Sequence, residues 1–396
     1  MTGWSLGSTA ERRARLARRH LLAAPARAQA AADVAGALIA LHGTDPASVY
    51  LATWARSGAG HRAIGHAAVE RALYEDRELV RMLGMRRTMF VVPAALAPVV
   101  QAACTDQIAE RLRSGLIRDL TAGGVGADAA AAGRWLDEVG AATVTALTAL
   151  GAATGAELAR AEPRLRTQLV YAEGKSYGGT ASITSRVLML LSAQRRIARG
   201  RPRGGWTSSQ YEWLPADPWP ARSAADARAE LARRWLLAFG PAPASDLQWW
   251  TGWTAGQARA ALGQLAIADV DLGGTPGVVL AGDGEPERAV EPWAALLPAL
   301  DPTPMGWRER DWFLGAHGPA LFDRSGNIGP TVWWDGRIVG GWAQRADGAV
   351  VFRLLEDAGA GAATAVTAEA ESLRSWLGPV RVTPRFRTPL ERELSA

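Results

Sequence analysis

The sequence predicts an α+β protein in which a small helical module recurs three times before a mostly β C-terminal domain. Two observations lead to this prediction. Up to about residue 295, groups of helical patterns alternate with short β-rich or Gly-rich segments, and from about residue 296 strand patterns dominate. The chain has 396 residues, enough for two or three domains of ordinary size. Hydrophobic residues make up 48% and charged residues 21%, a balance that excludes wholesale disorder.

The first module, residues 1–125, shows the order of its elements most clearly. Apolar residues repeat at helical spacing in four stretches, and a segment rich in β-formers, residues 85–93, follows them. The second helix ends at Asp45-Pro46, because the residue before a proline is pushed out of the helical region. Helices followed by a short β-segment are typical of a winged-helix module. The expected helices cover residues 10–23, 29–42, 47–56 and 67–74.

A similar pattern returns twice, which predicts three tandem winged-helix modules. The second module, residues 126–205, ends in a linker at 199–205, and the third, residues 206–295, has a helix that stops at Gly240-Pro241. The other expected elements are helices at 130–150, 155–160, 164–170 and 183–197 around a Gly-rich tract at 171–180, and then helices at 246–253 and 254–265 before β-like segments at 266–280.

The C-terminal domain, residues 296–396, is predicted to be mostly β. Asp335-Gly336 lies between two β-rich runs and is a strong signal for a hairpin turn. The predicted strands cover residues 331–334, 337–342, 349–354 and 380–384.

Several classes of protein are excluded by simple patterns. No apolar run reaches the roughly 18 residues needed to cross a bilayer. The arginines near the N-terminus lack an apolar stretch behind them, so no secretory signal is expected. A single cysteine, Cys104, excludes a disulfide framework and a cysteine-based metal site. The five histidines are scattered, and no phosphate-binding or dinucleotide-binding motif is present. We therefore expect a cytoplasmic protein without a metal ion or cofactor.

The basic residues are almost all arginine. The formal net charge is +5, and Lys175 is the only lysine among 44 basic residues. Arginine binds phosphate through a planar, bidentate fork. The charge alone favours nucleic-acid binding only slightly over other functions, because genomic base composition also produces an arginine bias.

The segment LHGTDPA, residues 41–47, places three chemically useful side chains together. His42, Thr44 and Asp45 leave a predicted helix end, where side chains can point into a groove. An imidazole that titrates near 6.5 can act as a general base or orient a water molecule. The more common alternative is that Thr44 or Asp45 caps the next helix by accepting hydrogen bonds from its free N–H groups.

These residues resemble the N-terminal motif of the AlkZ/YcaQ-type winged-helix DNA glycosylases. Four further segments agree with the family and follow in its order: MRRTMFVVP at 85–93, LARRWLLAFGP at 231–241, LPALDPTPMGW at 297–307 and PTVWWDGRIVGGW at 330–342. The resemblance covers about 300 residues. It implies three tandem winged helices and a C-terminal β-domain around a concave DNA-binding channel. The implied activity is hydrolysis of the N-glycosidic bond of alkylated purines, including bulky adducts and interstrand crosslinks, in repair or in self-resistance to a genotoxin.

The chain departs from the family at the catalytic positions. Glycosylases of this type carry Gln-x-Gln or Gln-x-Asp where this chain has His42-Gly43-Thr44, and Phe90 stands where a histidine is usual. An N7-alkylated guanine is already cationic, so its departure needs no general acid. His42 can accept a proton from the attacking water, Thr44 can position that water, and Asp45 can supply negative charge if it faces the channel.

The implied partner is damaged double-stranded DNA, bound by a monomer. Gly-rich loops and arginine clusters suit phosphate contacts, although such arginines also form solvated faces or pair with acids. The arginines of residues 12–19 are expected to form a solvated helix face. A non-catalytic DNA-binding or lesion-binding protein is the main alternative, and hydrolysis of an unrelated small substrate ranks last. The residues expected to contact DNA are Arg56, Arg86, Arg87, Lys175, Tyr177, Arg195, Arg196, Arg199, Arg201 and Arg203.

Overall fold

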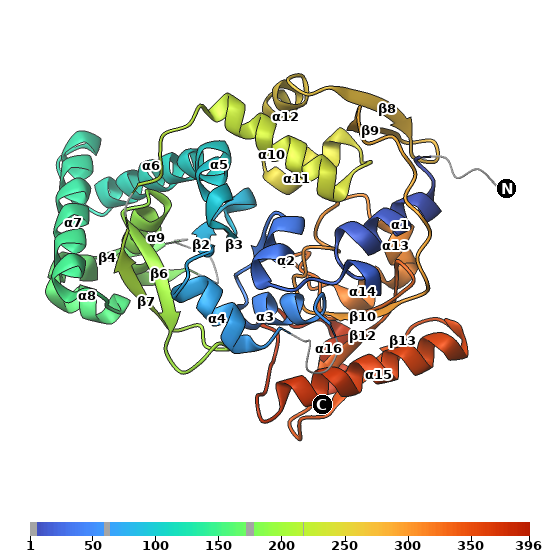
Figure 1. Ribbon diagram of the computed structural model, residues 1–396. Helices are drawn as coiled ribbons and strands as arrows, with labels where there is room; N and C mark the ends of the chain where they lie inside the picture. Colours follow the sequence, from blue (N-terminus) through green and yellow to red (C-terminus); the bar gives the residue numbers. More distant parts are fainter. Residues whose placement is uncertain (1–5, 59–63, 172–177, 217) are drawn as a thin grey trace.

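The computed structural model describes residues 6–58, 64–171, 178–216 and 218–396, and it is a mixed fold of helices and strands (Figure 1). The α+β class predicted from the sequence is confirmed at this level. Among the described residues, no helix is both long enough and apolar enough to cross a membrane.

The first unit of the fold contains the LHGTDPA segment. Its three short strands form an antiparallel sheet in the order β1-β3-β2, in which Leu41 pairs with Val91 and His42 with Phe90. Asp45 has an extended backbone and caps the next helix, and Pro46 occupies the first helical turn. The elements are α1 (Thr9–Arg19), α2 (Ala31–Ala37), β1 (Leu41–His42), α3 (Pro46–Trp54), α4 (His66–Tyr74), β2 (Leu79–Leu83) and β3 (Met89–Pro93).

In the first unit, helix α2 is followed by the short strand β1, two helices and a hairpin. The third unit repeats this order with a bridge in place of β1, and the second repeats it with an added hairpin, β4–β5, between its two helices. Ala153 bridges to Trp213 in the second unit, and Ala242 bridges to Val278 in the third. The second unit and the helices before it comprise α5 (Ala97–Val100), α6 (Asp106–Ala122), α7 (Ala129–Leu150), α8 (Gly155–Ala161), β4 (Gln168–Tyr171), β5 (Gly179–Ser182), α9 (Thr184–Ala193), β6 (Ile197–Pro202) and β7 (Tyr211–Pro215). The third comprises α10 (Ala224–Phe239), α11 (Ala244–Thr251), α12 (Ala255–Leu262), β8 (Ile267–Asp271) and β9 (Pro276–Leu280).

Two local predictions in the second unit are wrong. The predicted helix at 164–170 is a short 3-10 turn that leads into strand β4, because Pro163 starts a new turn and β4 pairs with β5. The predicted linker at 199–205 is largely strand β6. Its Gly and Pro content suggested a loop, but pairing with β7 satisfies its backbone, with an irregular register between Arg199 and Pro202.

The C-terminal region is not mostly β. Its sheet has the order β10-β11-β12-β13, and the predicted turn is confirmed, because Asp335 and Gly336 both have positive φ between β11 and β12. Helix α15 covers one side of the sheet. The elements are β10 (Ala294–Leu297), α13 (Asp311–Leu314), α14 (Gly318–Leu321), β11 (Thr331–Trp334), β12 (Arg337–Gln344), β13 (Val350–Leu354), α15 (Gly359–Leu377) and α16 (Pro389–Ser395).

The predicted strand at 380–384 is also wrong, since this segment forms neither a strand nor a helix. Its backbone is held by one side chain instead of a neighbouring strand. The amide of Gln344 donates to the carbonyl of Val380 and accepts from the N–H of Val382. This contact fixes the segment that leads to Arg385 beside the LHGTDPA segment.

The core is divided in a way that leaves the second unit apart. One large apolar cluster joins the first unit, the third unit and the C-terminal region, whereas the second unit has a separate cluster around α7, α8 and α9. Figure 1 shows these helices at one side of the molecule and α15 at the other, with the first unit between them. The first and second units are in contact along strands β2 and β6.

The arginine face of α1 is not a solvated face. The Arg12 guanidinium lies 4.1 Å from the ring centre of Trp312, and burial lowers its pKa to about 10. Arg15 pairs with Glu11 and Asp283, both at 2.8 Å. The prediction failed because α1 packs against later parts of the chain, which sequence periodicity in α1 alone does not show.

Arg56 lies in the interior and cannot contact DNA, so that prediction is wrong. Its side chain and that of Asp301 are both 0% exposed, and the guanidinium donates to both carboxylate oxygens at 2.7 and 2.8 Å. It also donates to the hydroxyl of Thr303 and the carbonyl of His20. Arg56 therefore joins the end of α3 to the loop after β10.

We predict that Arg56→Ala lowers the free energy of unfolding by about 3–5 kcal/mol, because Asp301 would remain as an uncompensated buried charge. Urea unfolding measures this. Arg374→Ala is the matched control, since Arg374 forms an exposed pair with Glu371. The double variant Arg56→Met/Asp301→Leu should lose less stability than Arg56→Ala, and a loss below about 1 kcal/mol for Arg56→Ala would contradict the prediction.

Candidate functional site

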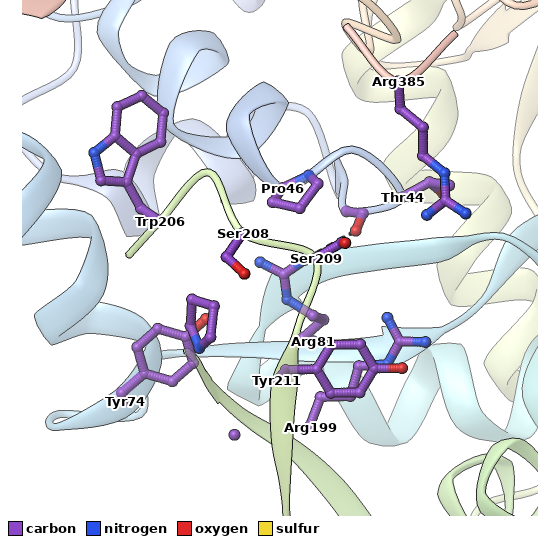
Figure 2. A pocket seen from close by; sticks show the side chains of 13 residues that line it. Thr44, Pro46, Tyr74, Arg81, Arg199, Trp206, Ser208, Ser209, Tyr211 and Arg385 are labelled. Atoms are coloured by element: carbon purple, nitrogen blue, oxygen red, sulfur yellow. Dashed lines mark hydrogen bonds between the residues drawn. The ribbon is translucent and has the colours of Figure 1, made fainter. Parts of the chain in front are cut away.

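The loop between β1 and α3 lies between two hollows in the protein surface. Hollow A has a volume of about 310 Å³ and hollow B about 530 Å³. Thr44, Arg199 and Arg385 line both of them. Figure 2 shows Arg385 pointing towards Thr44, on the same side of the hollow as Pro46 and opposite Tyr211. The hollows thus gather residues from the first unit, the second unit and the C-terminal segment.

Hollow A is lined by polar, aromatic and basic side chains. Arg81 from β2 donates to the carbonyl of Gly43 at 2.9 Å, and this hydrogen bond holds the LHGTDPA segment in place. Arg199 projects from β6, and its guanidinium lies 4.1 Å from the ring centre of Tyr211. Burial lowers the pKa of Arg199. The remaining side chains in this hollow include Tyr74, Trp206, Ser208 and Ser209 (Figure 2).

His42 is buried at the base of hollow B. Its side chain is 5% exposed and its ring centre lies 4.6 Å from that of Phe90, the residue opposite it in the sheet. Burial, assisted by the positive charge of Arg86, lowers the pKa of His42 to about 3. The imidazole is therefore neutral at ordinary pH, and it is a weaker base than the value near 6.5 assumed from the sequence.

His42 and Thr44 both carry a buried polar atom without a partner. Among the described residues, neither Nδ1 of His42 nor the hydroxyl oxygen of Thr44 has a hydrogen-bond partner. Buried polar atoms in proteins are nearly always hydrogen-bonded, so we expect a water molecule or a bound ligand to complete the bonding of these two atoms. The chemistry available here is hydrogen bonding from two neutral groups.

Asp45 does not face the same hollows. One carboxylate oxygen accepts from the N–H of Ala47 at 3.1 Å and the other from the N–H of Arg385 at 3.0 Å. It lines a different, narrow recess with Trp342 and Pro384. Burial raises the pKa of Asp45, and these hydrogen bonds oppose that rise. The helix-cap alternative accounts for its position, and the expectation that it faces the channel is not met.

The turn between β2 and β3 brings two predicted arginines to hollow B. Arg86 and Arg87 both have left-handed backbones, with φ of 51° and 58°. Arg86 is half-buried, and its guanidinium lies 4.1 Å from the ring centre of Trp249 in α11. Burial lowers its pKa to about 10. Arg87 is exposed at the rim.

The predicted cluster at 195–203 divides into different environments. Arg201 pairs with Glu70 and Glu75, and Arg203 pairs with Glu157 and Glu212, which fits the ion-paired alternative. Arg195 stacks on Trp219, and Arg196 is half-buried beside Gly140. Lys175 and Tyr177 lie outside the described residues. Arg199 is the member of this cluster that lines hollows A and B.

Two arginines at the site were missed by the sequence analysis. Arg81 sits on β2 and Arg385 on the unpaired C-terminal segment, far apart in the chain. Tyr211, which holds Arg199 in place, was missed as well. Arg81 alone had a local signal, a charged residue in a β-rich run. No local pattern marks Arg385, because tertiary contacts bring it to Thr44.

The two hollows have a strongly positive character. Among the described residues, no aspartate or glutamate lines hollow A or hollow B, whereas Arg81, Arg86, Arg87, Arg199 and Arg385 do. Also among these residues, no group of three or more histidine, cysteine, aspartate or glutamate side chains is placed to hold a metal ion. Such a site favours an anion, and clefts lined by one sign of charge concentrate ligands of the opposite sign.

Comparisons with known proteins define the class as DNA glycosylases. The family described as AlkZ-like DNA glycosylase matches residues 35–376, and the chain belongs to this family. The fold is similar to that of DNA glycosylase AlkZ from Streptomyces sahachiroi, with a TM-score of 0.71 and 22% sequence identity over 96% of this chain and 99% of that chain. No curated protein matches the sequence. The resemblance predicted from the sequence motifs is confirmed.

We predict that His42 makes folding sensitive to acid. Its pKa is about 3 in the folded protein and near 6.5 in the unfolded chain, so only the unfolded chain takes up the proton between these values. Stability is therefore lost as pH falls from about 6.5 towards 3. His42→Phe should reduce this loss by about 1 kcal/mol per pH unit in urea unfolding between about pH 6.5 and 4.5.

His66→Ala is the control for this experiment, because His66 is exposed at the start of α4. The unfolding of His66→Ala is measured over the same pH range as that of His42→Phe and the unmodified protein. Parallel curves for His42→Phe and the unmodified protein would show that His42 is not kept neutral by burial.

Proposed function

We propose that this protein hydrolyses the N-glycosidic bond of N7-alkylated purines in double-stranded DNA. One observation carries the proposal. His42 and Thr44 each have a buried polar atom without a partner among the described residues, and both residues line the arginine-lined hollow B, in the segment that resembles the catalytic motif of the family. Bulky adducts and interstrand crosslinks are included as substrates, in repair or in self-resistance to a genotoxin.

The proposal assigns the three repeated units to tandem winged-helix modules. The boundaries expected from the sequence are 1–125, 126–205 and 206–295, followed by the C-terminal domain at 296–396. Strand β7 pairs with β6, so we extend the second unit to residue 215. The repeated order of helix, bridge, two helices and hairpin supports this assignment. The protein is proposed to act as a monomer in the cytoplasm, without a metal or cofactor.

The chemistry proposed for His42 and Thr44 is the placement of water. Neutral His42 offers a ring nitrogen and Thr44 a hydroxyl, so together they can accept from and donate to one water molecule below the anomeric carbon. The cationic base leaves without a general acid. Negative charge for the developing oxocarbenium ion comes from the phosphates of the DNA itself, which Arg81, Arg199 and Arg385 hold nearby.

A second candidate function is DNA or lesion binding without catalysis. The specific observation in its favour is the absence of a strong base facing hollows A and B among the described residues. His42 has a pKa of about 3, and both oxygens of Asp45 are engaged in hydrogen bonds. A binder of this kind would use the arginines of the site and leave the glycosidic bond intact.

We predict that the protein releases base from a duplex with one N7-alkylguanine, and that His42→Ala and Thr44→Ala slow this release about tenfold or more. The reason is loss of the groups that hold the attacking water. Single-turnover base release, followed by cleavage at the abasic site, measures the rate. DNA affinity should hardly change, since both residues are neutral.

Arg374→Ala again serves as the control and should release base at the unmodified rate. If the unmodified protein releases no base above the spontaneous rate, even from a bulky N7 adduct, the protein is a binder. The DNA affinity should then depend on Arg87, and Arg87→Ala should reduce the slope of log affinity against log salt by about 0.9.

A further inference from the structure

Hollows A and B continue into a third hollow. Hollow C, of about 420 Å³, is lined by residues of β2 and β6 and shares Tyr74, Arg81 and Arg199 with hollow A. Arg199 lines all three hollows. Hollow A therefore adjoins both hollow B and hollow C, and we call the three hollows together the arginine groove.

The positive charge of the arginine groove is uncompensated among the described residues of hollows A and B, whereas Arg201 in hollow C pairs with Glu70 and Glu75. Among the described residues, no ion pair links Arg81, Arg199 or Arg385 to a carboxylate. Glu212, at the edge of hollow C, is the one acidic residue among the described lining, and it already accepts from Arg203 at 3.0 Å. The groove is thus matched to a ligand with several negative charges along its length.

Aromatic rings hold some of these guanidinium groups in place. Arg199 lies over Tyr211 and Arg86 over Trp249, each with 4.1 Å between the guanidinium carbon and the ring centre. Stacking of this kind leaves the charge intact while it limits the conformations of the side chain. A guanidinium plane held in this way offers a flat face to a nucleobase and N–H groups to a phosphate.

The size of the hollows favours single bases over a paired duplex. Each of the three, at about 310 to 530 Å³, has the volume of a site for one small molecule, on the scale of a nucleotide. A paired duplex hides its bases and is read by protein elements that project into its grooves. Here the charged and aromatic groups line recesses instead, so exposed bases would have to enter them.

We propose that the arginine groove binds single-stranded DNA, with the phosphates on Arg81, Arg199 and Arg385 and bases in the hollows. A positively charged groove with stacking surfaces is the arrangement that suits an unpaired strand. The proposal rests on the proposed function, because the strand in the groove is the lesion-bearing strand of the substrate, unpaired at the site. It adds that local opening of the duplex precedes water attack at Thr44.

The test uses undamaged DNA, so that it does not depend on catalysis. Fluorescence anisotropy compares a labelled single strand of about 20 nucleotides with a duplex of the same labelled strand, at matched salt. We expect the single strand to bind roughly tenfold tighter, since one stacked base is worth about 1–3 kcal/mol. A duplex with a short central bubble should bind with intermediate affinity.

Variants locate the binding in the groove. Arg199→Ala should weaken single-strand binding roughly tenfold and reduce the salt slope by about 0.7, the value for one phosphate contact on a single strand. Tyr211→Leu, which removes the ring under Arg199, should weaken binding less while leaving the salt slope nearly unchanged. Arg374→Ala is the control, and thermal melting by circular dichroism confirms that each variant is folded.

Three outcomes would overturn the proposal. These are a duplex that binds as tightly as the single strand, single-strand binding that Arg199→Ala and Arg81→Ala leave unchanged, and a single-stranded RNA of the same sequence that competes better than the DNA. Failure of the proposed function is a separate result, since base release is measured on damaged duplex. Tight single-strand binding without base release would support the groove and reject the glycosylase.

Discussion

The position of helix α3 is the constraint on which the site depends, and the buried pair of Arg56 and Asp301 sets it. This pair ties the end of α3 to the loop after β10. In the first turn of the same helix, the hydroxyl of Ser48 donates to the carbonyl of Ala299 at 2.7 Å. At the cap, Asp45 accepts from the N–H of Arg385. Helix α3 is therefore fixed to the C-terminal region at both ends, and His42 and Thr44 immediately before it inherit that position.

The same anchoring explains why the arginines of this chain have such different roles. Some are structural, as Arg15 and Arg56 are, because a carboxylate from a distant part of the chain meets them in the interior. Others, such as Arg201, pair with acids at the surface. Arg199 and Arg385 reach a place where no carboxylate is among the described neighbours in hollows A and B. The role of each arginine is decided by the acids brought near it, and burial alone does not distinguish them.

Local signals predicted the local structure well and the assembly poorly. Asp45-Pro46 starts a helix and Asp335-Gly336 forms a turn, because both depend on the backbone preferences of adjacent residues. Helix α15 was not predicted, although Ala362, Val366 and Ala370 repeat at helical spacing. The strand patterns on either side of it led to the prediction of a mostly β domain. The candidate site was found through the LHGTDPA motif. The burial of Arg56 and the approach of Arg385 depend on residues 245 and 340 positions away, which no local pattern contains.

The neutral state of His42 explains how this chain differs from its family without losing the character of the site. The family resemblance places a glutamine where His42 stands, and a glutamine side chain is polar, neutral and hydrogen-bonding at every pH. A histidine would differ if it became charged, since a cation there would repel both a cationic purine and an oxocarbenium ion. Burial against Phe90 and the charge of Arg86 keep the imidazole neutral. Thr44 is neutral as well. The pair thus preserves two uncharged hydrogen-bonding groups in a site whose charge is supplied by arginine.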